Sequence, residues 1–157
     1  MEKKQSITVM LGLILTLMTG CVYGQDRVIN QNQLPKTAKK FLLANFRGVP
    51  IASAIEDREI YGVDEYKVRL GNGIKVEFDS KGNWKEVDGE HQKVPNGFVP
   101  AAIRNYVAKN FPNTYMTKIK KERWKYKADL SNGLDIKFDR NGNFSKIDDW
   151  SGSASYQ

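Results

Sequence analysis

Few residues in this chain of 157 residues are of the types that perform catalysis or hold metals. The chain has one histidine, His91, and one cysteine, Cys21, which excludes a multi-histidine or cysteine-based metal site. His91 lies in a polar segment with no recurring partner around it, so we expect a solvated histidine there. The sequence therefore predicts no metal, no cofactor and no enzymatic activity.

Two aspartates are the remaining candidates for catalysis. Asp79 and Asp139 each open a turn-like segment, residues 79–83 and 139–143, with glycine and asparagine at its end. A hydrolase that uses two carboxylates would need both of them across one cleft. Recurrence in turns is better explained by aspartate side chains that bind their own backbone. Residues 139–143 also lack the residue order of a calcium loop.

Basic residues are unevenly distributed along the chain. There are 25 Lys and Arg against 18 Asp and Glu, for a net charge of +7. Residues 34–90 hold ten basic and ten acidic groups, whereas residues 94–149 hold eleven and six. A basic cluster could dock an acidic protein surface, an anionic glycan or lipid headgroups. The alternative is a solvated sheet face whose charges resist aggregation. The cluster consists of Lys118, Lys120, Lys121, Arg123, Lys125 and Lys127.

Residues 1–24 are predicted to be an export signal. Lys3 and Lys4 precede an apolar run over residues 7–18, which is too short to span a bilayer comfortably. Cleavage after Gly24 would reduce the net charge from +7 to +6. Residues 18–21 are also similar to a bacterial lipobox, which makes Cys21 a candidate for lipidation. We therefore expect a periplasmic protein, either free or anchored at the membrane or cell surface, and we exclude nucleic acid as a partner.

An internal repeat is the strongest pattern in the chain. At an offset of 65, apolar positions 38, 41, 42 and 46 match positions 103, 106, 107 and 111. These spacings place four apolar groups on one helical face. A Leu-Pro pair at 34–35 matches a Val-Pro pair at 99–100 and suits a helix start. At an offset of 60, Asn-Gly pairs and Phe-Asp-x-x-Gly-Asn segments also recur.

Each repeat is predicted to be one helix followed by an antiparallel meander. Expected strands are 51–58, 65–70, 74–79 and 84–88, then 115–122, 124–130, 134–139 and 144–148. Asn72-Gly73 and Asn132-Gly133 are typical of type I′ hairpin turns. The predicted units are therefore repeat 1 over 34–90, a polar linker over 91–98 and repeat 2 over 99–150.

Alternation along the strands assigns their side chains to two faces. The apolar face, which should carry the helices, contains Tyr66, Val68, Leu70, Ile74, Val76 and Phe78, then Trp124, Tyr126, Ala128, Leu130, Leu134, Ile136 and Phe138. The opposite face is charged and should meet solvent or a partner. Candidate partner-binding residues are Lys67, Arg69, Lys75, Arg123, Lys125, Lys127 and Lys137, with the aromatic residues Tyr61, Tyr115 and Trp150.

With these features the chain resembles the PepSY-like family of secreted Bacteroidetes proteins, whose fold is described as like that of the β-lactamase inhibitory protein. The resemblance rests on the export signal, the two helix-plus-meander repeats, the helix-opening prolines and the paired turn segments. It implies a periplasmic or surface location and no known enzymatic activity. The inhibitor grips an enzyme with aromatic residues on an open sheet face, whereas the face expected here is rich in Lys and Arg.

We therefore predict an α+β protein of two tandem repeats, with helices on one face of an antiparallel sheet and an open charged face. The predicted function is a non-enzymatic periplasmic or cell-surface module that binds a protein, in the manner of an inhibitor, through the open face. The alternative is binding of an anionic glycan or envelope component through the basic second repeat. Membrane contact is expected only through a lipid at Cys21.

Overall fold

The computed structural model describes residues 26–59 and 62–149. A two-residue strand, β1 (Arg27–Val28), and a short 3-10 helix, η1 (Gln31–Gln33), come first. Helix α1 (Lys36–Asn45) is followed by β2 (Ile51–Glu59), β3 (Gly62–Leu70), β4 (Lys75–Asp79) and β5 (Trp84–Asp88). Helix α2 (Ala101–Asn110) is followed by β6 (Met116–Lys121), β7 (Lys125–Leu130), β8 (Leu134–Asp139) and β9 (Phe144–Asp149).

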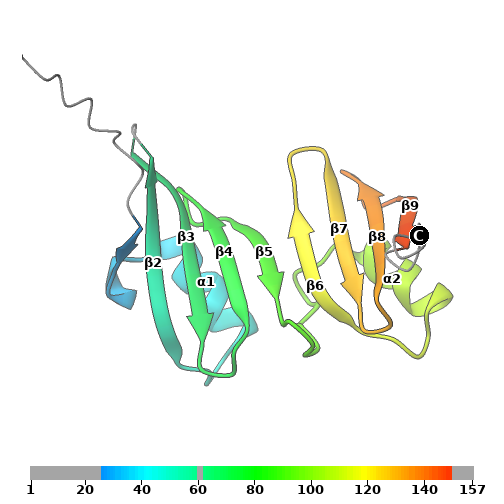
Figure 1. Cartoon of the computed structure of the whole chain (residues 1–157), viewed down its shortest axis with the longest axis horizontal. Helices are drawn as coiled ribbons and strands as arrows, with labels where there is room; N and C mark the ends of the chain where they lie inside the picture. The colour runs from blue at the N-terminus through cyan, green and yellow to red at the C-terminus, as the bar shows by residue number, and fades with distance from the viewer. Residues whose placement is uncertain (1–25, 60–61, 150–157) are drawn as a thin grey trace, which may run out of the picture.

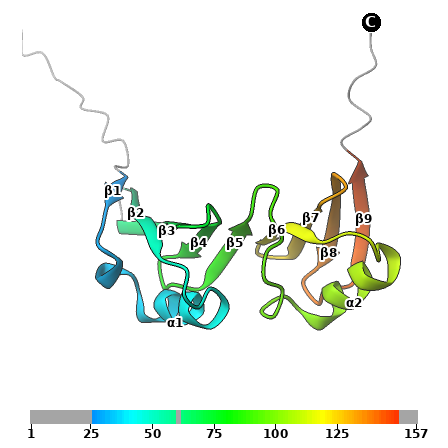
Figure 2. The ribbon, with the colours of Figure 1, turned by 90° about the horizontal axis from the view of Figure 1, so that it is seen from below.

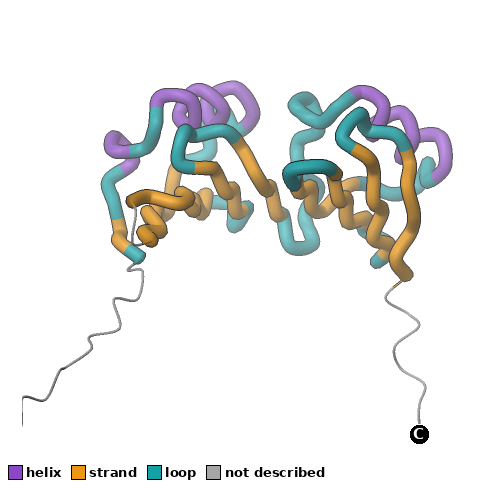
Figure 3. The backbone as a smooth tube through the Cα atoms, turned by 90° about the horizontal axis from the view of Figure 1, so that it is seen from above, coloured by secondary structure: helices purple, strands orange, loops and turns teal. Residues whose placement is uncertain are grey.

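The strands form one antiparallel sheet in which spatial order equals sequence order. Strand β5 pairs with β6 through Val87 opposite Ile119 and one pair on each side, so the sheet continues between the two halves (Figure 1). Both helices lie on the same face of this sheet, as Figure 2 shows. Figure 3 shows the same arrangement, with the helices on one side of the strands. The predicted α+β class, with helices on one face of an antiparallel sheet, is confirmed.

Each helix begins directly after a proline and buries one side against the sheet. Pro35 and Pro100 have φ of −52° and −51°, which suits the start of a helix. The eight predicted apolar positions are all buried or packed against the core: Ala38, Phe41, Leu42 and Phe46, then Ile103, Tyr106, Val107 and Phe111. Phe78 and Phe138 are fully buried beneath the helices. Each contacts a helix aromatic edge to face, at centroid distances of 5.7 Å to Phe41 and 5.5 Å to Tyr106.

The two Asn-Gly turns differ from the prediction. Gly73 and Gly133 have φ of +91° and +83°, but neither Asn72 nor Asn132 has a positive φ. The type I′ prediction is therefore wrong, because that turn needs positive φ at both central residues. The amide of Gly73 donates to the Leu70 carbonyl at 2.9 Å. This closes a turn whose central residues precede the glycine, and the glycine then takes the left-handed position.

One other expectation is corrected, and one predicted segment contains a buried residue. Trp124 is predicted to lie on the buried face, but β7 begins at Lys125 and the Trp124 side chain is 61% exposed in the preceding turn. The segment 91–98 is predicted to be a polar linker, but Val94 within it is 1% exposed. The Val94 amide donates to the Met116 carbonyl at 3.0 Å, so the segment lies alongside β6.

Several predictions lie outside the described residues: the export signal 1–24, the lipidation candidate Cys21, Tyr61 and Trp150. In the part that the structure describes, no helix is long and apolar enough to cross a membrane.

Candidate binding surface

The sheet face that carries no helix presents two adjacent rows of side chains across β3 to β9, which we call the open face. Within a row, successive residues are register partners on neighbouring strands, so their side chains are about 5 Å apart. The first row contains Lys67, Glu77, Glu86, Lys120, Lys127, Lys137 and Lys146. The second row contains Arg69, Lys75, Asp88, Lys118, Asp129, Asp135 and Asp148.

On β6 to β9, the first row consists of lysines alone, and the second row ends in three aspartates. Like charges directly opposite each other are destabilising, so the rows depend on ion pairs between a residue of one row and a residue of the other. Lys127 Nζ lies 2.6 Å from Asp135 Oδ2, and Lys146 Nζ lies 2.7 Å from Asp148 Oδ1. Lys137 also pairs with Asp148, and the two lysines lower the pKa of Asp148 to about 2. Carboxylates therefore neutralise much of the positive charge on this half of the open face.

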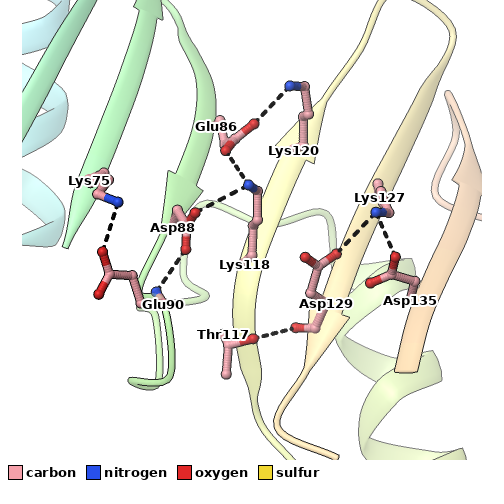
Figure 4. Close-up of polar contacts among 10 residues, drawn as sticks. All are labelled: Lys75, Glu86, Asp88, Glu90, Thr117, Lys118, Lys120, Lys127, Asp129 and Asp135. Carbon is pink, nitrogen blue, oxygen red and sulfur yellow. Dashed lines mark hydrogen bonds and ion pairs between the residues drawn. The ribbon is translucent and has the colours of Figure 1, made fainter. Parts of the chain in front are cut away.

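Glu86 joins the two halves of the open face at the β5–β6 contact (Figure 4). Its side chain is only 9% exposed, and its two oxygens lie 2.6 Å from Lys118 Nζ and 2.9 Å from Lys120 Nζ. Lys118 also reaches Asp88 Oδ2 at 3.2 Å. Burial would lower the pKa of Lys118, but its hydrogen bonds to Glu86 and Asp88 outweigh this and raise it. The charges at this contact are thus fixed in position by one another.

Ion pairs also occupy the N-terminal half. Lys67 Nζ lies 2.7 Å from Asp57 Oδ2 and 3.3 Å from Glu65 Oε1. The hydrogen bond to Asp57 is the main reason why the pKa of Lys67 is raised. Glu65 also accepts from Lys85 at 2.6 Å. In both halves, therefore, most of the open-face lysines form an ion pair with a carboxylate.

A pocket of about 480 Å³ lies beside Asp129 and Asp135 of the second row, next to the β7–β8 turn. It is lined mainly by polar residues: Glu90, His91, Tyr115, Thr117, Asp129, Ser131 and Asp135, with Leu130 and Gly133. Burial, together with the neighbouring Asp135, raises the pKa of Asp129 to about 6. Among the residues that the structure describes, no group of three or more His, Cys, Asp or Glu is placed to hold a metal ion.

Asp129→Asn is expected to stabilise the protein at neutral pH by about 1–2 kcal/mol. The folded carboxyl holds its proton up to about pH 6, whereas an unfolded aspartate releases it near pH 4. The folded state therefore binds more protons in this window, and the contribution of Asp129 to stability falls as pH rises through it. Chemical denaturation at pH 4, 5, 6 and 7 measures the free energy of unfolding. We expect the difference between the variant and the wild type to move in favour of the variant as the pH rises.

Asp79→Asn is the control in which the pKa shift has the opposite sign. Burial alone would raise the pKa of Asp79, but the hydrogen bonds of its turn together outweigh this and lower it. This variant should lose stability relative to the wild type at pH 7 and recover the difference as the pH falls through the folded pKa. If Asp129→Asn behaved in the same way as Asp79→Asn, the raised pKa of Asp129 would be wrong.

Asp79 and Asp139 have the same structural role in their turns. Asp79 Oδ1 accepts from the amides of Lys81 and Asn83 at 2.9 and 2.8 Å, and Oδ2 accepts from the Asn83 side chain. Asp139 makes the equivalent three hydrogen bonds. The pKa of each carboxyl is lowered, with hydrogen bonds from its own turn favouring the charged form. The structure therefore contradicts a hydrolase built on this pair and supports the turn interpretation.

The structure places the predicted partner-binding residues that it describes on the open face, at the β6–β7 turn and, for Tyr115, next to His91. Four lie on the open face and have a carboxylate partner: Lys67, Lys75, Lys127 and Lys137. Arg69 is exposed on the same face. Arg123 and Lys125 lie at the β6–β7 turn, where Lys125 pairs with Glu122 at 3.0 Å. Tyr115 is 39% exposed, and its hydroxyl donates to the His91 carbonyl at 3.3 Å.

Two residues that the sequence interpretation missed lie beside Arg123. The guanidinium carbons of Arg123 and Arg140 are 5.2 and 5.9 Å from the ring centroid of Trp124. Arg140 belongs to the β8–β9 turn, so the contact joins two turns at one end of the sheet. In an antiparallel meander, alternate turns lie at the same end of the sheet, so the predicted strand order could have indicated that these two turns are close. Strand alternation instead assigned Trp124 to the core.

The family of the chain follows from its sequence as well as its fold. Residues 64–146 match the family described as "Putative beta-lactamase-inhibitor-like, PepSY-like". The chain belongs to this PepSY-like family, as the resemblance seen in the sequence predicts. No curated protein matches the chain.

Three solved structures from Bacteroides are similar. One, from Bacteroides thetaiotaomicron, is described as a "putative calcium-regulated periplasmic protein"; it is 39% identical, with a TM-score of 0.74, covering 78% of this chain and 96% of its own. One from Bacteroides vulgatus, a "putative periplasmic protein", is 41% identical with a TM-score of 0.74, covering 79% and 97%. Another from that species, a "putative periplasmic protein of unknown function", is 34% identical with a TM-score of 0.74, covering 80% and 100%.

Proposed function

We propose that the protein is a non-enzymatic periplasmic or cell-surface module that binds another protein through its open face, in the manner of an inhibitor. The observation that carries the proposal is a helix-free sheet face lined by two rows of charged side chains (Figure 4). The predicted export signal and the periplasmic descriptions of three similar proteins support the location. The words "beta-lactamase-inhibitor-like" in the family description support the comparison with an inhibitor.

Ion pairs make this face suitable for a specific partner. A lysine held by one or two carboxylates has already lost part of its side-chain freedom, so less entropy is lost when it meets a partner. On β6 to β9 a row of lysines lies beside a row that ends in three aspartates, and this pattern rewards one register of an opposing charged surface and penalises others. The open face is therefore better suited to recognising one complementary protein surface than to binding polyanions in general.

The alternative, an anionic glycan bound by the basic second repeat, receives less support from the geometry. Lys118, Lys120 and Lys127 all have a carboxylate within 3 Å. A polyanion would have to displace these internal partners or bind beside them, which weakens the long-range attraction expected from the lysines alone. Calcium is likewise left out of the proposal, because the described residues gather no cluster of metal ligands.

Site-specific photo-cross-linking tests the proposal. A benzophenone amino acid is placed at Arg69 or Lys146, which are exposed on the open face, and at Lys40 or Ala108, which are exposed on the helices. After irradiation in intact cells, we expect a discrete protein adduct from the two open-face positions and not from the helix positions. Adducts from the helix positions alone, or no protein adduct from any position, would contradict binding through the open face.

A further inference from the structure

A second exposed surface lies at the end of the sheet where the β6–β7 and β8–β9 turns meet. We call Lys121, Arg123, Trp124 and Arg140 the basic tip. Trp124 is 61% exposed, more than any other aromatic residue that the structure describes. Both arginines approach its ring, at 5.2 and 5.9 Å from the centroid. Such contacts are cation–π interactions, which hold the guanidinium groups close to one another across two turns.

The residues of the β6–β7 turn are not those that a tight turn requires. The amide of Glu122 donates to the Lys125 carbonyl at 2.9 Å, which leaves Arg123 and Trp124 as the two loop residues. Two-residue hairpin loops favour Gly, Asn and Asp. The β3–β4 and β7–β8 turns, by contrast, contain the small and turn-forming residues Gly71-Asn72-Gly73 and Ser131-Asn132-Gly133. Two large side chains at this position contribute little to the turn itself and suggest a role outside the fold.

The basic tip also differs from the open face in its charge balance. On the open face, most lysines have carboxylate partners. Among the described residues, Lys121, Arg123 and Arg140 take part in no ion pair. Lys121 Nζ instead lies 5.8 Å from the ring centroid of Trp84. The basic tip therefore carries positive charges that are not neutralised by carboxylates of the described residues and that can meet a partner.

We propose that the basic tip docks an acidic protein segment, a surface and an activity that are independent of the open face. Guanidinium groups bind carboxylates with paired hydrogen bonds, and Trp and Arg are both enriched among the residues that contribute most to protein–protein binding. A sugar would need to stack on the indole ring, but two guanidinium groups already approach that ring. The geometry therefore favours carboxylate side chains over a glycan.

Binding of a defined peptide tests the proposal. The probe is a fluorescein-labelled, glutamate-rich peptide with one central leucine, and the reference is the same peptide with glutamine in place of glutamate. We expect the acidic peptide to bind in a salt-sensitive manner and to shift the Trp124 indole signal in ¹H–¹⁵N spectra more than that of Trp84. The double variant Arg123→Gln/Arg140→Gln should weaken binding by at least about tenfold, and Trp124→Ala should do the same.

The matched control is Arg47→Gln/Lys109→Gln, which removes two exposed positive charges from helix ends and should leave peptide affinity unchanged. Equal weakening by both double variants would show only general attraction and would overturn the proposal. Binding of polygalacturonate oligosaccharides, but not of the acidic peptide, would also overturn it in favour of a glycan. Because no open-face residue is changed, either result leaves the cross-linking test of the proposed function intact.

Discussion

Replacing Gly82 with alanine is expected to lower the free energy of unfolding by about 3 to 4 kcal/mol. Gly82 has a φ of +83° in the β4–β5 turn, and a Cβ in this conformation costs about 1–2 kcal/mol. The added Cβ would also lie 2.7 Å from Pro35 Cβ and 2.9 Å from the Ala38 backbone nitrogen. The turn therefore packs against the start of α1, and either the turn or the helix would have to move. Urea denaturation followed by circular dichroism measures the loss.

Gly133→Ala is the matched control for this prediction. Gly133 has the same φ of +83°, but an added Cβ would have no neighbour within 4 Å. Only the conformational cost applies, so we expect a loss of about 1–2 kcal/mol. Equal losses in the two variants would show that the close approach to α1 does not contribute to stability.

Alternation and turn residues were sufficient to predict most strands. The predicted ranges 84–88 and 134–139 match β5 and β8. Apolar side chains alternate along β8, whereas the bounds of β5 follow from the turn residues on both sides of it. The two helices also begin after the predicted prolines. Strand β1 was not predicted, because its two residues are too few to show any period. Its existence depends on pairing with distant residues of β2, such as Arg27 opposite Glu56.

Trp124 shows where strand alternation fails. It has the same parity as Tyr126 and Ala128, which do face the helices. Alternation, however, describes a residue only while it remains in the strand, and β7 begins one residue after Trp124. At the end of a hairpin, the exposure of a side chain depends on whether another segment of the chain packs against the turn. The local sequence does not contain that information. The partner of Trp124, Arg140, comes from a turn sixteen residues away in the chain.

The open face was predictable in composition but not in pairing. Alternation correctly placed Lys67, Lys75, Lys127 and Lys137 on the charged face, and the lysine cluster was visible from residue types alone. Whether a lysine is free or neutralised depends on the residues that lie beside it on its own and neighbouring strands. For Lys118 these neighbours are on β5, in the other half of the sheet. Because that β5–β6 pairing joins segments separated by a helix, no local pattern could predict it.

Glu86→Ala is expected to lower the free energy of unfolding by about 2 to 3 kcal/mol. The Glu86 carboxylate is 9% exposed and is shared by Lys118 and Lys120 at 2.6 and 2.9 Å. Its removal would leave two partly buried ammonium groups close to each other, with Lys127 opposite Lys120 on the next strand. Thermal and urea denaturation measure the loss, and high salt should reduce it by screening the repulsion among the lysines.

The consequence of Glu86→Ala should be local as well as global. Strands β5 and β6 are joined by three register pairs, whereas β7 and β8 are joined by five, so the contact between the halves depends more on each interaction. Amide hydrogen exchange should therefore accelerate first in β5 and β6. Glu122→Ala, which removes only the exposed ion pair with Lys125, should change stability by about 0.5 kcal/mol or less. If exchange accelerated equally in β2 and β3, the β5–β6 contact would not be the weak point of the sheet.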